Sequence, residues 1–259
     1  VLALGGGRLR PHDGVNRQLI RYPGLHHGFM QMAGHLREAD RAFDDAAAFV
    51  RAHLAVAVER ALQQHPQDLR WGIVGVSMRQ PDTHDALAPQ RGLYTLAERD
   101  AVADGTPRQR LQVIGCLREL LVAPREPQAV LERIASAEAA IVSRTVTEKG
   151  YATVAEGSAA DLIVRGLALR RARGRGGLTL LSLDNLPSNG KRLRERVLER
   201  AAREADALGV WIDAQCTFPC SMVDRIVPRT TPADVQAVSV ALGAHDAWPA
   251  LAEPFTDWV

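Results

Sequence analysis

Polar side chains that could bind and polarise a substrate oxygen stand together in the stretch Asp184-Asn185-Leu186-Pro187-Ser188-Asn189-Gly190. This stretch follows an apolar run over residues 178–183 that is typical of a buried strand. In an open α/β sheet, ligands bind beyond the carboxyl ends of the strands, so Asp184 and Asn185 fall where chemistry would occur. Ordinary turn formation explains the same residue types, and that alternative stays open. Asn189 is placed to cap the following helix.

A second polar pair, Asp224 and Arg225, follows an apolar segment and precedes Pro228. An acid beside a base in this position fits either a functional group or a structural ion pair, and the local sequence favours neither. Arg225 is expected to hold the turn together.

The three cysteines, Cys116, Cys216 and Cys220, are expected to be reduced, and Cys216 and Cys220 are expected to be buried structural thiols. Their number is odd, and the pair at 216 and 220 has no neighbouring histidine that would complete a metal site. The sequence therefore predicts no metal.

The composition is that of an ordinary globular protein, with 46% hydrophobic and 24% charged residues among 259. A formal net charge of +2 is too small to favour a nucleic acid or an anionic membrane as partner. No apolar run approaches the roughly 18 to 20 residues that a membrane span needs. The opening apolar run is too short for a signal peptide, so a cytoplasmic location is expected.

From Trp71 onward, short β-rich runs alternate with helical stretches, a pattern that predicts βαβ units around a parallel sheet. The predicted strands cover residues 71–76, 140–146 and 178–183. The predicted helices cover residues 49–64, 128–137, 159–173 and 191–208. The expected fold is α/β, a Rossmann-like doubly wound, mostly parallel sheet with helices on both faces. Residues 1–45 show no sustained period, and their structure is not predicted.

Residues 184–190, followed by Met-Val-Asp-Arg-Ile-Val-Pro at 222–228, resemble the signature of the mannitol dehydrogenase family. This family includes mannitol and arabinitol dehydrogenases and the fructuronate and tagaturonate reductases. Further similar stretches occur in the family's order, at residues 71–76, 94–96, 145–151 and 253–255. The resemblance covers roughly residues 46–259 and implies a Rossmann-like NAD-binding domain of this type.

The resemblance implies an oxidoreductase that transfers a hydride between NAD and a secondary alcohol without zinc. The implied substrate is a polyol or sugar acid such as mannitol, arabinitol or mannonate. Asn185 matches the family asparagine whose side-chain N–H stabilises the oxygen that gains negative charge as hydride leaves. Asp224 matches an acid close to the substrate that orients it. The alternative hypothesis is a non-catalytic Rossmann-like module that binds a nucleotide or a protein.

The resemblance also assigns six residues to the cofactor: Asp82, Phe49, Arg51, Thr147, Glu148 and Asn185. Asp82 matches an acid on the adenosine ribose, where a carboxylate accepts hydrogen bonds from hydroxyls and repels a 2′-phosphate. The implied cofactor is therefore NAD. Capping of the next helix is the alternative role for Asp82, and satisfaction of local backbone groups is the alternative for Thr147.

The sequence departs from the family at both ends. Before Phe49, the family's glycine-rich turn is replaced by a segment containing Asp44 and Asp45, which is expected to weaken dinucleotide binding. Residues 1–45 form an atypical N-terminal segment unrelated to the family. The family's helical catalytic domain, which carries a lysine base, follows the segment that corresponds to Trp258-Val259. We expect this domain to be absent, the chain alone to have little or no activity, and an exposed domain interface to promote self-association.

Overall fold

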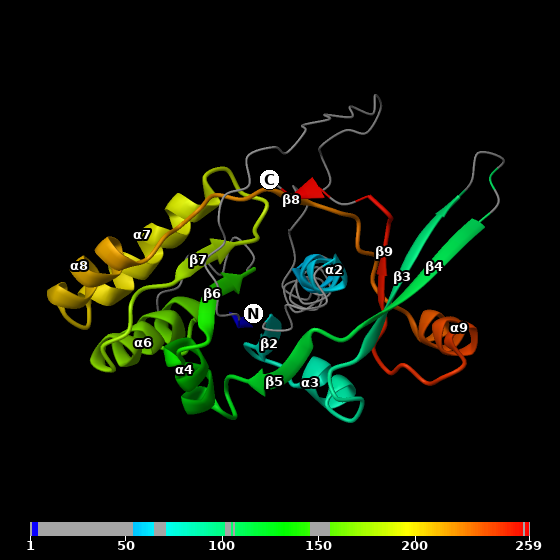
Figure 1. Ribbon diagram of the computed structural model, residues 1–259, viewed down its shortest axis with the longest axis horizontal. Helices are drawn as coiled ribbons and strands as arrows, with labels where there is room; N and C mark the ends of the chain where they lie inside the picture. Colours follow the sequence, from blue (N-terminus) through cyan, green and yellow to red (C-terminus); the bar gives the residue numbers. More distant parts are fainter. Residues whose placement is uncertain are drawn as a thin grey trace, which may run out of the picture.

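The computed structural model describes residues 2–4, 54–64, 71–101, 105, 107–145, 156–255 and 257–258, with the backbone alone for 2–4, 224, 257 and 258. The strands are β1 (Leu2–Leu4), β2 (Gly72–Ser77), β3 (Tyr94–Ala101), β4 (Pro107–Ile114), β5 (Leu117–Val122), β6 (Ala139–Arg144), β7 (Thr179–Ser182), β8 (Val223–Asp224), β9 (Ala250–Ala252) and β10 (Asp257–Trp258). The helices are α2 (Val56–Gln64), α3 (Asp82–Leu87), α4 (Pro127–Ala135), α6 (Ala159–Ala172), α7 (Asn189–Ala202), α8 (Asp206–Gln215) and α9 (Pro232–Leu242) (Figure 1).

The main sheet has five strands in the order β5-β2-β1-β6-β7. β2 is parallel to β5 and β6 is parallel to β7, whereas β1 is antiparallel to both of its neighbours. Four of the five strands therefore run in the same direction around one reversed central strand. The strand order is that of a dinucleotide-binding fold, which has a switch point between its first and fourth strands. The expected Rossmann-like, mostly parallel sheet is confirmed, and the three predicted strands correspond to β2, β6 and β7.

Packed elements cover both faces of this sheet. Neighbouring residues on a strand point to opposite faces, so two adjacent residues of β2 show what packs on each face. Val74 of β2 packs into a core with residues of α4, α6, α7 and α8. The preceding residue, Ile73, packs into a second core with residues of α2, α3, β3 and β9. The predicted placement of helices on both faces is confirmed. Figure 1 shows α2 between the main sheet and a second sheet.

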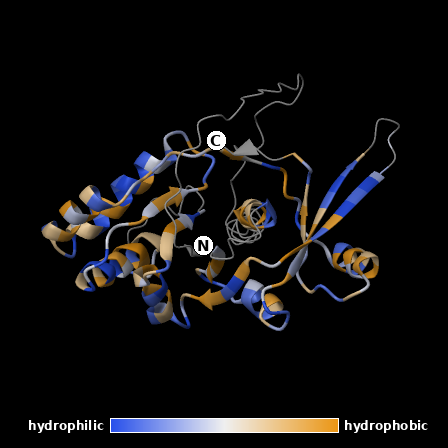
Figure 2. Cartoon of the chain, in the orientation of Figure 1, coloured by the Kyte–Doolittle hydropathy of each residue, from blue (hydrophilic) through white to orange (hydrophobic). Residues whose placement is uncertain are grey.

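The second sheet has three strands in the order β4-β3-β9. β3 and β4 form an antiparallel hairpin, β9 is parallel to β3, and α9 packs against the sheet through Val238, Ala97 and Leu251. The sequence pattern did not predict this sheet, because most of β4 is exposed or half-exposed and lacks a sustained apolar alternation. Figure 2 shows hydrophilic residues along the projecting end of the hairpin.

The helix predicted over 191–208 is two helices. Leu193, Val197 and Ala201 form the buried face of α7, as their spacing indicated, but α7 ends at Ala202. Ala205 is extended, with φ −167° and ψ 135°, and α8 begins at the next residue. This break turns the chain so that α8 packs into the same core as α7. The other predicted helices correspond to α2, α4 and α6, with Pro127 at the start of α4.

Of the two cysteines predicted to be buried, Cys216 is buried and Cys220 is not. Cys116 and Cys216 are buried, whereas Cys220 is exposed, because it lies in the segment that leaves the core beyond Cys216. Burial, assisted by the negative charge of Glu59, raises the pKa of the Cys116 thiol to about 12. Among the helices that the structure describes, none is both long enough and apolar enough to cross a bilayer.

Candidate functional site

Asn185 stands at the apex of a tight turn just beyond β7. The pairing of β7 with β6 extends one residue past the strand, where the Leu183 N–H donates to the Arg144 carbonyl at 2.9 Å. The Leu186 N–H then donates to the Asp184 carbonyl at 2.8 Å, which closes a three-residue γ-turn. Asn185 has a negative φ, so the turn is of the inverse kind, and its side chain is exposed at the carboxyl edge of the sheet.

The chain enters α7 through an unusual backbone conformation. Ser188 is the N-cap, has the left-handed angles φ 55° and ψ 38°, and makes no side-chain cap hydrogen bond. Asn189 is the first residue of the helix, so its predicted place as the cap is wrong. A Cβ on Gly190 would lie 2.4 Å from the Pro219 carbonyl oxygen, so only glycine lets α7 start this close to the 218–219 backbone.

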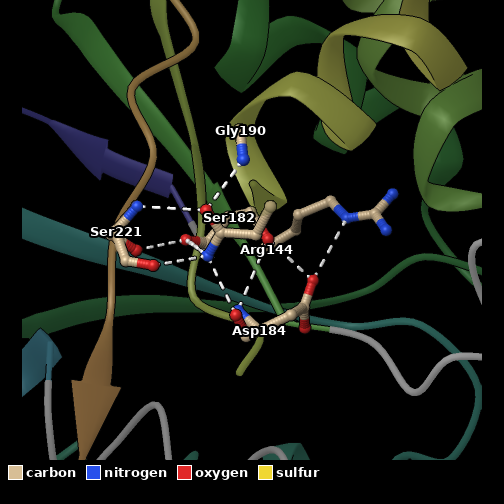
Figure 3. A network of polar contacts seen from close by, with 6 residues as sticks. Arg144, Ser182, Asp184, Gly190 and Ser221 are labelled. Carbon is tan, nitrogen blue, oxygen red and sulfur yellow. Dashed lines mark hydrogen bonds and ion pairs between the residues drawn. The ribbon is translucent and has the colours of Figure 1, made fainter. Parts of the chain in front are cut away.

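The buried side-chain amide of Asn189 is the centre of a hydrogen-bond network (Figure 3). Its Nδ2 donates to the carbonyls of Ser182 at 3.2 Å, Asp184 at 2.9 Å and Ser221 at 2.7 Å. Its Oδ1 accepts from the backbone N–H groups of Gly190 at 2.7 Å and Ser221 at 3.0 Å. The Ser221 hydroxyl also donates to the Ser182 carbonyl, at 2.5 Å. One side chain thus joins the end of β7, the start of α7 and the segment that precedes β8.

A buried ion pair lies beside this network. The Asp184 carboxylate accepts a hydrogen bond from the Ser182 hydroxyl at 2.8 Å and lies 4.0 Å from Nε of Arg144. The exposed fractions of the two charged side chains are 6% for Arg144 and 3% for Asp184. Arg144 ends β6 and Asp184 follows β7, so the pair connects the carboxyl ends of adjacent strands. Sequence reasoning missed Arg144, because its strand position gave no sign of an inward-pointing charge.

The segment that carries Asp224 reaches the same edge of the sheet. The Leu180 N–H donates to the Thr217 carbonyl at 2.8 Å, and the Thr217 N–H donates to the Leu178 carbonyl at 3.1 Å. The segment therefore runs alongside β7 in the same direction and meets its end at Ser221. β8 follows, and its backbone pairs with β10. The structure thus joins the turn that carries Asn185 to the segment before β8 at Ser221, while the Asp224 side chain lies outside the described residues.

Arg225 has a structural role, as expected, but its partner comes from a distant strand. Its guanidinium is buried, pairs with Glu98 of β3 at 2.6 Å and donates to the Glu253 carbonyl at 2.9 Å. Arg60 of α2 pairs with the same Glu98 oxygen at 3.3 Å. Burial lowers the pKa of Arg225, and the hydrogen bond that Arg225 donates to Glu98 opposes that shift. Arg225 therefore joins β8 to the second sheet.

Asp82 is exposed and is the first residue of α3, shortly after the end of β2. The N-cap of α3 is Pro81 and no side chain caps the helix, so the alternative role predicted for Asp82 is wrong. Four other predicted cofactor residues lie outside the described residues: Phe49, Arg51, Thr147 and Glu148. Within the part of the chain that the structure describes, no group of three or more His, Cys, Asp and Glu side chains could hold a metal ion.

Comparison with known proteins identifies relatives along most of the chain. The model of the mannitol dehydrogenase Rossmann domain matches residues 46–259. Mannitol 2-dehydrogenase of Pyrenophora tritici-repentis is 39% identical over 239 residues, which cover 82% of this chain and 40% of that protein. D-mannonate oxidoreductase of Escherichia coli is 35% identical over 237 residues, which cover 82% of this chain and 47% of that protein.

Two solved structures share the fold. The Pseudomonas fluorescens mannitol 2-dehydrogenase, in a ternary complex with NAD and D-mannitol, aligns with a TM-score of 0.73 and 35% identity over 82% of this chain and 46% of its own. A substrate-free D-sorbitol dehydrogenase aligns with a TM-score of 0.72 and 31% identity over 82% and 47%. The chain spans about half the length of the relatives it matches. On the family match and the shared fold together, this chain belongs to the mannitol dehydrogenase family.

Proposed function

We propose that this chain binds NAD and contributes to hydride transfer between NAD and a secondary alcohol of a polyol or sugar acid. The observation that carries the proposal is the exposed Asn185 side-chain amide at the carboxyl edge of a Rossmann-like sheet. Asn189 holds the turn that carries this amide, through its hydrogen bond to the Asp184 carbonyl. Relatives named for mannitol and mannonate support this substrate class.

The described residues fit a dinucleotide. In the order β5-β2-β1-β6-β7, the chain adds strands on one side of β1 and then, from β6 onward, on the other side. In such sheets the ligand binds outside the carboxyl ends of the strands at this switch point. The exposed Asp82 carboxylate, beyond β2, is free of a capping role and would accept hydrogen bonds from the adenosine ribose. Phe49, Arg51, Thr147 and Glu148 are the further cofactor contacts in this proposal.

The proposed chemistry assigns different roles to Asn185 and Asp224. NAD, when bound, accepts the hydride. The alcohol oxygen gains negative charge as the hydride leaves, and the Asn185 N–H stabilises that charge without carrying any itself. The Asp224 carboxylate would accept a hydrogen bond from a substrate hydroxyl and orient the substrate.

The alcohol proton also needs a base, a contribution worth about 10²- to 10⁴-fold in rate. We place the base in a further domain, because the relatives are about twice as long as the part that this chain matches. Residues 46–259 are then the cofactor-binding domain, and residues 1–45 an atypical N-terminal segment whose Leu2–Leu4 form β1 in the main sheet. The chain alone should therefore bind NAD with little turnover.

A cofactor titration tests the proposal. The four tryptophans provide a fluorescence signal for NADH and NADPH binding, and mannitol, arabinitol and mannonate serve as substrates in a parallel turnover assay. The expected result is saturable NADH binding, tighter than NADPH binding, with little turnover. Binding of another nucleotide or of a protein in place of NADH would favour the non-catalytic module instead, and absence of any nucleotide binding would refute the cofactor assignment.

The proposal includes a cytoplasmic location and self-association through exposed apolar residues near β8. Two buried free cysteines, Cys116 and Cys216, support a reducing compartment. Cell fractionation tests the location, and a secreted or membrane-bound chain would contradict it.

A further inference from the structure

We infer that Asn189 is a positioning residue, which holds the Asn185 turn in register with the segment leading to Asp224. The inference rests on the proposed function, because Asn185 and Asp224 have roles in chemistry only if the chain serves a dehydrogenase. Asn189 itself is buried, so it acts on the site through the backbone that it binds.

The first step of the argument is a shared carbonyl. The Asp184 carbonyl accepts the Leu186 N–H that closes the γ-turn around Asn185, and it also accepts Nδ2 of Asn189 at 2.9 Å. A γ-turn is held by a single hydrogen bond, so the second donor fixes the oxygen on which the turn depends. The direction of the Asn185 side chain is set by this turn.

The second step is the way Asn189 pairs with Ser221. The Ser221 carbonyl accepts from Nδ2 at 2.7 Å, and the Ser221 N–H donates to Oδ1 at 3.0 Å. Two residues that exchange hydrogen bonds in this way reproduce a pair in an antiparallel ladder, so the side-chain amide takes the place of a peptide group. The segment before β8 is thereby fixed at one residue, only three positions from Asp224.

The third step is chemical specificity. The network needs both a donor and an acceptor on one short planar group, and only an amide provides both in any protonation state. An aspartate would keep the acceptor but would direct a carboxylate at the carbonyl oxygens of Ser182, Asp184 and Ser221. An alanine would leave those carbonyls without this donor. Both substitutions should therefore release the turn from the 221–224 segment.

The chain offers a simple spectroscopic test, because it contains three asparagines, Asn16, Asn185 and Asn189. Selective ¹⁵N-asparagine labelling of the full chain gives three side-chain amide pairs and three backbone amides in an NMR spectrum. Single substitutions of Asn185 and Asn189 assign them. In the unmodified chain, the Asn189 side-chain amide should exchange slowly with deuterium oxide and the exposed Asn185 amide quickly.

The deciding variant is Asn189→Ala, with Asn189→Asp as its partner. In both, the Asn185 backbone order parameter should fall from about 0.85, typical of rigid backbone, to below about 0.6. The matched control is Arg200→Ala. Arg200 lies near the other end of α7 and pairs with Asp161, whose side chain is fully buried, so the substitution removes an ion pair at the opposite end of the same helix. It should lower the melting temperature and leave the Asn185 order parameter unchanged.

Three results would overturn the inference: an ordered Asn185 in Asn189→Ala, an ordered Asn185 in Asn189→Asp, or an equal loss of order in Arg200→Ala. If Asn189→Ala does not fold, the unmodified chain still tests the inference, because an Asn189 side-chain amide that exchanges as fast as the Asn185 amide would contradict the buried network. An NADH titration of the unmodified chain runs in parallel. Its failure would refute the proposed function, whereas an ordered Asn185 in the variants would refute only the positioning role.

Discussion

At the residue scale, the described part of the proposed site is built on short polar side chains at the end of β7. Asn185 is neutral and exposed, whereas the charged residues nearest to it in the network, Asp184 and Arg144, are buried and paired with each other. Burying a charge is costly unless it is paired. The pair therefore supports the backbone, and the exposed Asn185 amide is the group that we propose for the ligand.

Replacement of Asp82 with alanine should weaken NADH binding about tenfold, the size expected for hydrogen bonds to a charged group. NADPH binding should change less, because the carboxylate that repels a 2′-phosphate is also gone. Fluorescence titration with both cofactors measures the change. Asp85→Ala is the matched control, since Asp85 lies in the first turn of the same helix and pairs with His84 and Arg125. An equal loss in both variants would contradict the ribose role.

At the element scale, α9 illustrates how local sequence fixes a helix end. Thr231 is the N-cap, Asp234 completes a capping box, and Pro232 is at the start of the helix. The hydrogen bond from Thr231 and the ion pair with Arg99 lower the pKa of Asp234 to about 2. The cap and the contact with β3 therefore depend on an ionised carboxylate.

The free energy of unfolding should carry a contribution from Asp234 of about 1 to 2 kcal/mol, as expected for a helix cap. Because the folded pKa is depressed, this contribution is present above the unfolded pKa near 4 and is lost as the pH falls toward 2. Urea unfolding of the unmodified chain and of Asp234→Ala, at pH 7 and at pH 2.5, measures it. The two proteins should differ at pH 7, the difference should shrink as the pH falls to 2.5, and a constant difference would contradict the linkage.

The Arg225–Glu98 pair joins two elements that are distant in sequence. Arg225→Ala should lower the free energy of unfolding by about 3 to 5 kcal/mol, because Glu98 would remain buried with its main partner removed. The double variant Arg225→Met with Glu98→Gln should be less damaging. Urea unfolding at pH 7 checks both, with Arg194→Ala as the control, since its exposed pair with Asp213 is worth about 1 kcal/mol or less. Similar losses in the control and in Arg225→Ala would contradict a buried pair.

At the scale of the whole molecule, two sheets share one core around α2, and the β8–β10 pair lies at the edge of the assembly (Figure 1). Large apolar side chains beside this pair are exposed: Met222 by 54%, Ile226 by 60% and Phe255 by 46%. Large apolar side chains that are exposed near one pair of strands are expected to mark an interaction site. This surface supports the proposed self-association.

Sedimentation velocity should detect a concentration-dependent dimer or larger species of the chain. Ile226→Glu should shift the distribution toward monomer, because a charge would have to be desolvated in the contact. Val240→Glu is the control, since Val240 is 76% exposed but lies on α9. A chain that stays monomeric at all concentrations, or an equal effect of both substitutions, would contradict the use of this surface.

The sequence by itself determined the fold class, the strands β2, β6 and β7, and the position of Asn185 at a strand end. These follow from short-range patterns, because apolar periodicity and turn residues act within about ten positions of the chain. The family resemblance, which the comparisons confirm, likewise rests on local motifs. The second sheet, the break between α7 and α8 and the exposure of Cys220 had no such local signal.

Only the tertiary structure decided what the polar residues contact. The type and spacing of Asn189 predicted a helix cap, yet its amide binds Ser221 across the sheet edge, and Arg225 pairs with Glu98 rather than with a neighbour. Which buried donor meets which acceptor depends on how distant segments pack, because an unsatisfied polar group in the core costs about 1 to 3 kcal/mol. Whether a buried polar group finds a partner therefore depends on segments that are far apart in the chain, and the pattern of residues along the sequence does not show which segments meet.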